Sequence, residues 1–231
     1  MAIKTLSTPP RTPPMRTSPT LRRVLAPYPR SVELPDGATV VLRPLVGGDR
    51  DKLVALFIDI PHEELRNLQD NVSDPTVVLR WCRNLNYGRV LPIVAELDGK
   101  LVGDATLHRR TVGPMRQIGR FRAYVRPEYR NRGIGTVLLQ EIMSVAQQVG
   151  LTQLAVELYE DQTALRKVFS RYGFREEGRI PVYQRVILLR DLAAEQETAG
   201  TAGEETAAPG EMTTGTILGR DGPRPRLPGA P

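Results

Sequence analysis

The chain has 231 residues, 40% of them hydrophobic, which suits one folded domain or two small ones and excludes a fully disordered protein. Its single cysteine excludes an internal disulfide framework, and its two histidines, His62 and His108, are too far apart in sequence to suggest a zinc centre, so we expect no metal site. No apolar stretch reaches the roughly 18 residues of a membrane span. We therefore expect a cytoplasmic protein without a membrane partner.

The net charge of +6 comes largely from the N-terminal end of the chain. Residues 1–32 carry six basic side chains and no acidic one, whereas residues 194–231 carry three arginines and six acidic residues. The part between them is only weakly basic, which argues against a domain that binds a specific nucleic acid. Both ends are rich in proline and poor in large apolar residues. We therefore predict a disordered basic arm over residues 1–27, one folded domain over 28–193 and a disordered tail over 194–231.

From residue 32 onward, hydrophobic periodicity and turn residues predict alternating strands and helices. Asp36-Gly37 and Asp98-Gly99 are typical of hairpin turns, and Asp74-Pro75 is typical of a helix start. In chain order the pattern predicts strands over 32–34 and 39–42, helices that begin at Asp49, Pro61 and Asp74, strands over 90–97, 101–107 and 118–125, a helix over 135–149, a strand over 153–158, a helix over 161–172, and strands over 174–179 and 182–189. This order predicts an α+β fold with a mixed central sheet and helices on both faces.

One stretch between a predicted strand and a predicted helix has the features of an anion-binding loop: Arg126-Pro-Glu-Tyr-Arg-Asn-Arg-Gly-Ile-Gly-Thr136. Gly133 and Gly135 lack the Cβ atoms that would block a ligand. The helix start supplies unpaired N–H groups and the positive end of the helix dipole. The arginines at 126, 130 and 132 add full charges. The loop therefore predicts a site for a pyrophosphate or another multiply charged anion.

A dinucleotide-binding loop is the main alternative for this stretch. The Rossmann pattern requires a third glycine where this chain has Leu138, although Glu157 lies at the separation typical of a ribose-binding acid. A P-loop is excluded because no Gly-Lys-Ser/Thr sequence follows the glycines.

The loop and a second motif together resemble the GNAT superfamily of acyl-CoA N-acyltransferases. The run VRPEYRNRGIGTVLL contains Arg130-x-x-Gly133-x-Gly135, and a helix and turn, Ala164…Gly173-Phe174, follows at the separation typical of that family. The opening ELPDGATVVLRPL is also similar to bacterial protein lysine acetyltransferase domains. The resemblance covers residues 32–192. It implies a GNAT-type sheet, acetyl-CoA as co-substrate, and a primary amine on a small molecule or a protein lysine as acceptor.

In GNAT proteins the pyrophosphate of acyl-CoA binds the loop amides, and the pantetheine arm pairs with the strand before the loop. The resemblance also implies that the N–H of Val125 polarises the thioester carbonyl. Carried over to this chain, it implies that CoA is bound by the strand end, the loop and the second motif, that is, by Tyr124, Val125, Arg130, Asn131, Arg132, Gly133, Ile134, Gly135, Thr136, Asp161 and Phe169.

The residues that carry acid–base chemistry in many GNAT proteins are absent at their usual positions. Many GNAT proteins have an acid on the strand before the loop, where this chain has Gly119. They have a tyrosine that protonates the leaving thiolate where this chain has Phe169, and an asparagine at the start of the last helix where it has Asp161. The CoA site is therefore intact in the sequence, while the proton-transfer residues have to be sought elsewhere.

Two replacements for these residues remain open. Alternation along the third predicted core strand places Asp104 and His108 on one face, with Leu101 on the other, so a carboxylate and an imidazole could relay a proton. Alternatively, Glu157 is the base and Tyr159 the acid, since alternation places both on one face of the next strand.

Three functions fit the sequence. We expect an acetyl-CoA-dependent N-acetyltransferase, a monomer or a homodimer paired through the apolar strand 182–189. A non-catalytic acyl-CoA sensor or interaction domain is the alternative, because Gly119 and Phe169 replace the usual residues. A dinucleotide-binding protein is the third hypothesis. Glu64, Asp70 and Asp74 lie in the region that walls the acceptor site, and these acids would suit a cationic amine.

Overall fold

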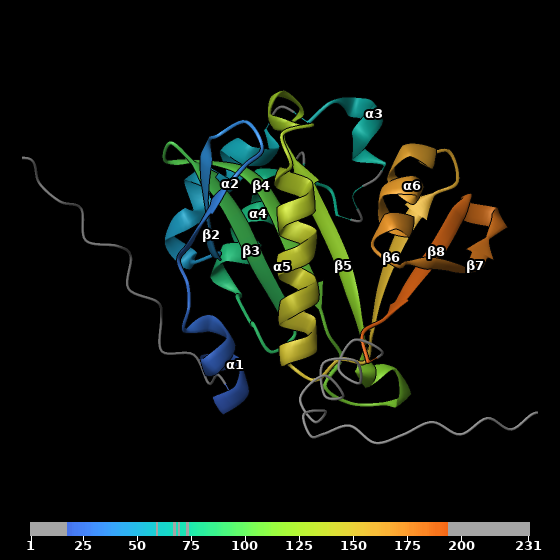
Figure 1. Ribbon diagram of the computed structural model, residues 1–231. Helices are drawn as coiled ribbons and strands as arrows, with labels where there is room; N and C mark the ends of the chain where they lie inside the picture. The colour runs from blue at the N-terminus through green and yellow to red at the C-terminus, as the bar shows by residue number, and fades with distance from the viewer. Residues whose placement is uncertain (1–17, 59, 67, 69, 73, 194–231) are drawn as a thin grey trace, which may run out of the picture.

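The computed structural model describes residues 18–193, except residues 59, 67, 69 and 73 (Figure 1). The start of the predicted arm, residues 1–17, and the predicted tail, residues 194–231, lie outside the described residues. Eight strands form one sheet in the order β1-β2-β3-β4-β5-β6-β8-β7. Every neighbouring pair is antiparallel except β5 and β6, which are parallel, so the mixed sheet that the sequence predicts is confirmed.

The strands and helices match most of the ranges expected from periodicity. The strands are β1 (Arg30–Glu33), β2 (Thr39–Pro44), β3 (Val90–Leu97), β4 (Lys100–His108), β5 (Ile118–Val125), β6 (Gln153–Tyr159), β7 (Arg175–Ile180) and β8 (Arg185–Asp191). The helices are α1 (Pro19–Leu25), α2 (Arg50–Phe57), α3 (His62–Leu65), α4 (Pro75–Arg83), α5 (Ile134–Gln148) and α6 (Thr163–Arg171).

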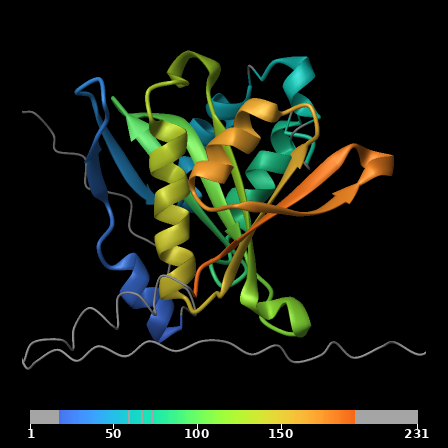
Figure 2. The same ribbon diagram turned by 45° about the vertical axis from the view of Figure 1, so that its right-hand side comes forward.

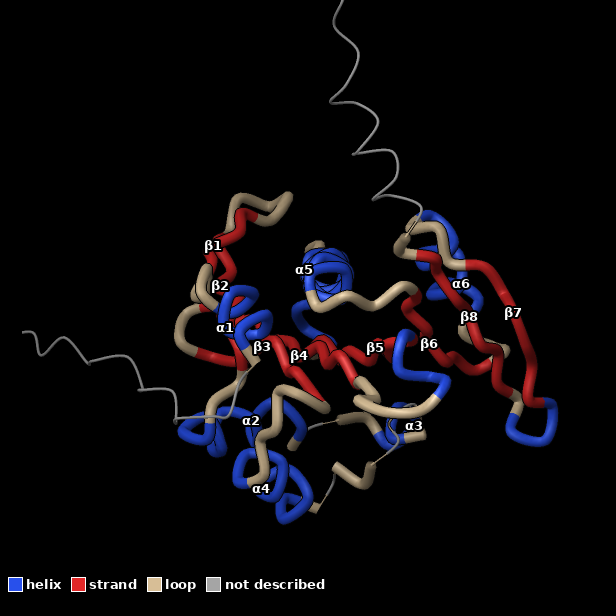
Figure 3. The backbone as a smooth tube through the Cα atoms, turned by 90° about the horizontal axis from the view of Figure 1, so that it is seen from below, coloured by secondary structure: helices blue, strands red, loops and turns tan. Residues whose placement is uncertain are grey.

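The helices cover both faces of the sheet. Seen end-on in Figure 3, α5 and α6 lie on one side of the sheet, and α2 and α4 lie on the other. Two apolar clusters correspond to these layers: the larger joins α5 and α6 to most strands, and the smaller joins α2 and α4 to β3, β4 and β5. The hairpin of β7 and β8 extends outward beyond α6 (Figure 2). The end of β5 therefore lies between the two layers, where a site can be reached from either face.

The predicted disordered arm over 1–27 is wrong for its final part. The side chain of Ser18 accepts a hydrogen bond of 3.2 Å from the Leu21 amide and caps α1, which begins at Pro19. Leu21 and Val24 are each only 2% exposed and join the cluster around α5. A proline-rich composition therefore does not prevent order where a capped turn presents two apolar side chains to a core.

Strand β4 also departs from simple alternation. Residues 95 and 96 of β3 face residues 103 and 101 of β4, which leaves Val102 as the extra residue of a bulge. As a result, Leu101 lies in the cluster under α2 and α4, together with Tyr124. The prediction that placed Leu101 on the face opposite Asp104 is wrong, because the bulge reverses the side-chain direction once within the strand.

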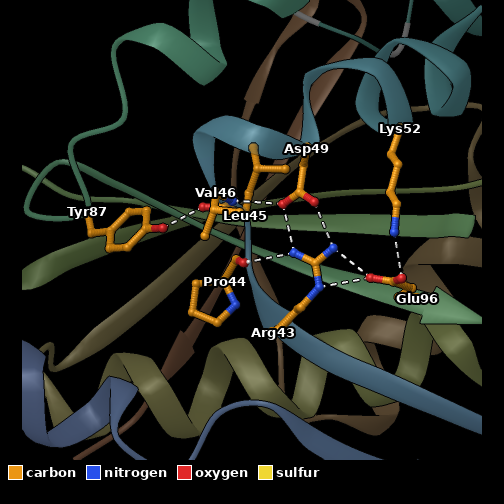
Figure 4. Close-up of polar contacts among 8 residues, drawn as sticks. All are labelled: Arg43, Pro44, Leu45, Val46, Asp49, Lys52, Tyr87 and Glu96. Atoms are coloured by element: carbon orange, nitrogen blue, oxygen red, sulfur yellow. Dashed lines mark hydrogen bonds and ion pairs between the residues drawn. The ribbon is translucent and has the colours of Figure 1, made fainter. Parts of the chain in front are cut away.

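A buried polar network fixes the connection from β2 to α2 (Figure 4). The guanidinium of Arg43 donates to Asp49 at 2.7 and 2.8 Å and to Glu96 at 2.8 and 2.6 Å. Asp49 is 3% exposed and also accepts from the Val46 amide at 2.8 Å. Burial lowers the pKa of Arg43, but its bonds to Asp49 and Glu96 outweigh burial and raise the pKa above its usual value.

Replacing Asp49 with alanine is expected to destabilise the fold by about 3 kcal/mol or more, because it leaves the buried Arg43 without one of its two charge partners. Urea unfolding of the full chain measures this loss. Asp51→Ala is the matched control, since the Asp51 side chain is 85% exposed, and we expect a change of about 0.5 kcal/mol or less there. Equal effects of the two substitutions would contradict a structural role for the network.

Candidate functional site

Strands β5 and β6 pair only at their first residues. The parallel register joins residues 118–120 of β5 to residues 153–155 of β6, and the two strands do not pair with each other beyond these residues. The two strands then separate toward the end of the sheet where α5 begins (Figure 1). We call this divergence the β5–β6 splay. It leaves backbone groups on the facing edges of both strands without a strand partner.

Val125 is among the residues whose backbone faces the splay. The N–H of Arg126 donates to the carbonyl of Val102 at 3.0 Å, so this N–H points toward β4. Because hydrogen-bonding direction alternates along a strand, the N–H groups of Ala123 and Val125 point away from β4, toward β6. The geometry therefore offers Val125 N–H as a donor in the splay.

The loop that follows β5 presents a run of unpaired amides. Asn131 and Gly133 have φ values of 60° and 93°, and a Cβ on Gly133 would lie 3.0 Å from Pro35, so this position requires glycine. Val137 N–H makes the first bond of α5, to the Gly133 carbonyl at 3.0 Å. Within the described residues, the amides of residues 131–136 have no hydrogen-bond acceptor. The start of this 15-residue helix is therefore suited to a phosphate group.

The loop arginines do not carry free charges, contrary to our expectation. Each one binds a carboxylate: Arg126 binds Glu128, Arg130 binds Glu64, and Arg132 binds Asp36. The bond from Arg132 lowers the pKa of Asp36, and the bond to Glu64 raises the pKa of Arg130. The Arg130 guanidinium also lies 5.9 Å from the centroid of the Tyr124 ring. An incoming anion therefore meets the amides first, and the arginines only if these pairs open.

Asp104 lies on β4 directly opposite Tyr124, one residue from Val125 in the register. Its Oδ1 atom is buried and has no hydrogen-bond partner within the described residues. Burial raises the pKa of this carboxyl to about 7. Since the group changes protonation near neutral pH, it can act as a general base.

His108 does not form the proton relay with Asp104 that alternation suggested. The two residues are four positions apart on β4, about 13 Å along a strand. The Nε2 atom of His108 lies 3.1 Å from the Thr106 hydroxyl, and His108 pairs in register with Arg120. Burial, followed by the charges of Arg122 and Arg120, lowers the pKa of His108 to about 4. No hydrogen bond therefore joins Asp104 to His108 within the described residues, and the lowered pKa favours the neutral form of His108.

Glu157 and Tyr159 share one face of β6, as alternation predicted, and both contact Arg185 of β8. Arg185 lies 3.2 Å from the Glu157 carboxylate and donates to the Tyr159 hydroxyl at 3.1 Å. Its guanidinium also lies 4.2 Å from the centroid of the Tyr159 ring, with Arg66 at 5.0 Å from the same centroid. If the β5–β6 register is continued by two and four residues, Glu157 and Tyr159 lie across the splay from residues 122 and 124.

The two second-motif residues have different surroundings. Asp161 precedes α6 and forms an exposed ion pair with Arg66. Phe169 is 7% exposed, with its ring centroid 5.9 Å from that of Phe121 and 5.2 Å from that of Phe174. The position of the usual tyrosine is therefore filled by a core ring that has no proton to donate.

Sequence reasoning missed the contacts of Arg185 and Glu64. Arg185 lies at the start of β8, and only the antiparallel pairing with β6 shows that it faces Glu157 and Tyr159. Glu64 was considered for a cationic amine, but it binds the loop instead. Asp74, considered for the same purpose, caps α4 with a bond of 2.8 Å from the Thr76 amide. The pattern of charges along the sequence does not indicate which residues these side chains contact.

None of the groups of His, Cys, Asp and Glu side chains in residues 18–193, outside the four gaps, is arranged to hold a metal ion. In that part of the chain, too, we find no helix with the length and apolar character that crossing a membrane requires.

Comparison with known proteins agrees with the fold and the loop. Residues 57–174 match the model of the acetyltransferase (GNAT) family. The chain is 30% identical over 175 residues to L-2,4-diaminobutyric acid acetyltransferase of Nocardia farcinica, covering 76% of this chain and 81% of that protein. It is 25% identical over 148 residues to acetyltransferase Pat of Mycolicibacterium smegmatis, covering 63% of this chain and only 44% of that protein.

Solved structures show the same fold. The GNAT domain of S. lividans PAT superposes with a TM-score of 0.63 at 20% identity, covering 70% of this chain and 96% of that domain. Mycobacterium smegmatis RimJ, solved with CoA-disulfide, gives a TM-score of 0.54 at 22% identity, covering 75% of this chain and 96% of that one. With its mixed sheet, its splayed strands and a family match over half its length, this chain belongs to the GNAT acetyltransferase family.

Proposed function

We propose that this chain transfers the acetyl group of acetyl-CoA to a primary amine. The observation that carries the proposal is one arrangement: the unpaired amides of residues 131–136 begin where β5 ends, and the N–H of Val125 faces the splay just before them. In the proposed complex the pyrophosphate binds these amides, the pantetheine arm pairs with Ala123 in the splay, and the thioester carbonyl accepts from Val125. The curated relatives, both named as acetyltransferases, support acyl transfer.

The acceptor amine has to lose a proton before it attacks. An ordinary lysine amine has a pKa of about 10.4, so almost all of it is protonated at neutral pH. Asp104 takes this proton through a water molecule in the proposed mechanism, since its buried carboxyl has a pKa raised to about 7 and lies opposite Tyr124. The nitrogen then forms a bond to the thioester carbon, and Val125 N–H stabilises the negative charge that develops on the carbonyl oxygen.

Collapse of this intermediate breaks the carbon–sulfur bond and releases the CoA thiolate, and the second proton of the attacking nitrogen passes to water to leave the neutral amide. Tyr159 donates a proton to this thiolate in our proposal, because the β5–β6 register, if continued, places it across the splay from Tyr124. Arg185 holds the Tyr159 hydroxyl and also binds Glu157. Because the Glu157 carboxylate is already bound by the Arg185 guanidinium, we assign Glu157 to positioning Arg185 rather than to proton removal.

The domain assignment and the compartment are part of the same proposal. We assign the transfer to one domain within residues 18–193. A cytoplasmic location suits the single cysteine, Cys82, which is buried and free.

Acetyl transfer by the full-length chain tests the proposed function. Acetyl-CoA is mixed with free amines, amino acids with side-chain amines, and lysine peptides, while free CoA thiol and acetylated product are measured. We expect thiol and acetylated amine in equal amounts with at least one acceptor class. Saturable acetyl-CoA binding without transfer to any class would contradict the proposal and favour a non-catalytic acyl-CoA sensor.

A further inference from the structure

One stretch of the sequence contains several arginines and no acidic residue. Between Asp104 and Glu128 the sequence has six arginines and no acidic residue. This stretch forms the end of β4, the loop containing the short helix Pro114–Gln117, and β5. Within the described residues, four of its arginines form no ion pair with a carboxylate: Arg109, Arg110, Arg116 and Arg120. The arginines of the CoA loop, by contrast, are all paired.

The exposed part of this stretch forms a surface at the end of the sheet opposite the CoA loop. We call it the basic hairpin and define it by Arg110, Arg116, Arg120, Val112 and Met115. Its three arginines are exposed, and its two apolar side chains are 77% and 48% exposed. A surface that combines unpaired cations with exposed apolar side chains suits an acidic polypeptide. Carboxylates of the polypeptide can bind the cations, and its apolar side chains can pack on the exposed apolar ones.

The basic hairpin continues into the splay along one face of β5. Arg120 and Arg122 point to the same face, because they are two residues apart on the strand. Arg122 is half-buried, and burial lowers its pKa, as do the charges of Arg120 and Arg185. The carboxylates that act on it in the opposite direction are Asp70 and Glu157, and Glu157 is already bound by Arg185. Arg120 and Arg122 therefore place two guanidinium groups on the acceptor side of the splay.

Strand geometry gives the spacing between these cations and the reaction centre. Arg122 is three residues from Val125, about 10 Å along the strand, and Arg120 is five residues from it, about 17 Å. An extended peptide covers these distances with roughly three and five residues. A small amine would reach only the first of the two arginines, whereas a polypeptide reaches both and the basic hairpin beyond them.

We propose that the acceptor amine is presented by an acidic polypeptide. Carboxylates roughly three to five residues from the amine lie along the face of β5 that carries Arg122 and Arg120, and the flanking segment lies on the basic hairpin. This inference rests on the proposed acetyl transfer and adds the class of its acceptor. A nucleic acid fits the surface less well, because Phe121, the aromatic residue in the stretch 108–122, is buried and leaves no ring on which bases could stack.

Matched peptides test the proposal on the full-length chain. Both peptides have a blocked N-terminus and a single lysine. One peptide has glutamate at the third and fifth positions before and after the lysine, and the other has glutamine at the same four positions. We expect kcat/KM to be about tenfold higher for the glutamate peptide at low salt, and the ratio to shrink as salt screens the charges.

Substitutions connect this preference to the surface. Arg120→Glu is expected to abolish the preference, and a peptide with arginine at the four flanking positions is expected to recover the lost rate. Arg171→Glu is the matched control, since Arg171 is exposed on α6, on the opposite side of the sheet (Figure 3). We expect it to keep the wild-type preference.

The outcomes separate this inference from the proposed function. Absence of transfer to every peptide and every free amine would contradict the proposed function itself. Equal rates with the two peptides, at retained acetyl transfer, would overturn the inference alone. A free diamino acid used faster than either peptide would overturn it in favour of a small acceptor. Inhibition by a single-stranded oligonucleotide, without a preference between the peptides, would assign the basic hairpin to nucleic acid instead.

Discussion

Replacing Gly135 with tryptophan is expected to weaken acetyl-CoA binding about 100-fold or more while the chain stays folded. A Cβ at Gly135 would lie 3.9 Å from Val125, an ordinary contact, so the helix accepts a side chain at this position. The indole would then occupy the space in front of the amides of residues 131–136, where we place the pyrophosphate. Calorimetric titration of the full-length chain with acetyl-CoA measures the loss.

The same substitution at Gly178 provides the control. A Cβ on Gly178 meets nothing within 4 Å, and β7 is an edge strand separated from β5 by β6 and β8. Gly178→Trp is therefore expected to bind acetyl-CoA like the wild type. If Gly135→Trp also keeps wild-type affinity in a folded chain, the pyrophosphate does not bind at the start of α5.

Asp104→Asn is expected to lower kcat by about 100-fold to 10,000-fold and, at pH 8, to raise the free energy of unfolding. Asparagine keeps the shape of the side chain but cannot accept the proton of the amine. It also removes a carboxylate whose Oδ1 atom is buried without a partner. Loss of activity with gain of stability distinguishes a group kept for catalysis from one kept for folding.

The pH dependence of stability follows from the direction of the pKa shift. Burial raises the pKa of Asp104 from 3.8 to about 7, so the folded chain holds this proton over a range where the unfolded chain has lost it. Stability therefore falls as pH rises from about 4 to about 7. We expect the stability advantage of Asp104→Asn to be full at pH 8 and to disappear near pH 4, as measured by urea unfolding.

The pH profile of the rate tests the same group independently. The wild-type rate is expected to rise with pH through about 7 as Asp104 loses its proton, and the residual rate of Asp104→Asn is expected to lack this rise. Asp98→Asn is the control, because Asp98 has a φ of 50° in a hairpin turn, a conformation that asparagine also accepts. Full activity of Asp104→Asn would show that another group acts as the general base, and Glu157 would be the next candidate.

The parts of the fold that sequence predicted are those set by local patterns. Strands 90–97 and 118–125 have the predicted bounds, because an apolar run meets a turn or loop at each end. The CoA loop was predictable for a similar reason: a positive φ at Gly133 and a helix start immediately after it are features of a few consecutive residues. Such features depend little on the rest of the chain.

The parts that sequence could not give depend on contacts between distant segments. Glu64 and Arg130 are 66 positions apart, and only the packed structure brings them together. The pairing of Arg185 with Glu157 requires the register of two strands from different parts of the chain. In β4 one extra residue, Val102, redirects the side chains in a way that strict alternation cannot anticipate. Side-chain partners on different strands can therefore be identified only from the structure.

A crystal structure of the full-length chain with acetyl-CoA tests the central claim most directly. We predict pyrophosphate oxygens within hydrogen-bond distance of the amides of residues 131–136, the pantetheine arm between β5 and β6, and the thioester oxygen facing the N–H of Val125. Acetyl-CoA bound away from this loop, or a thioester that does not face Val125, would contradict the account.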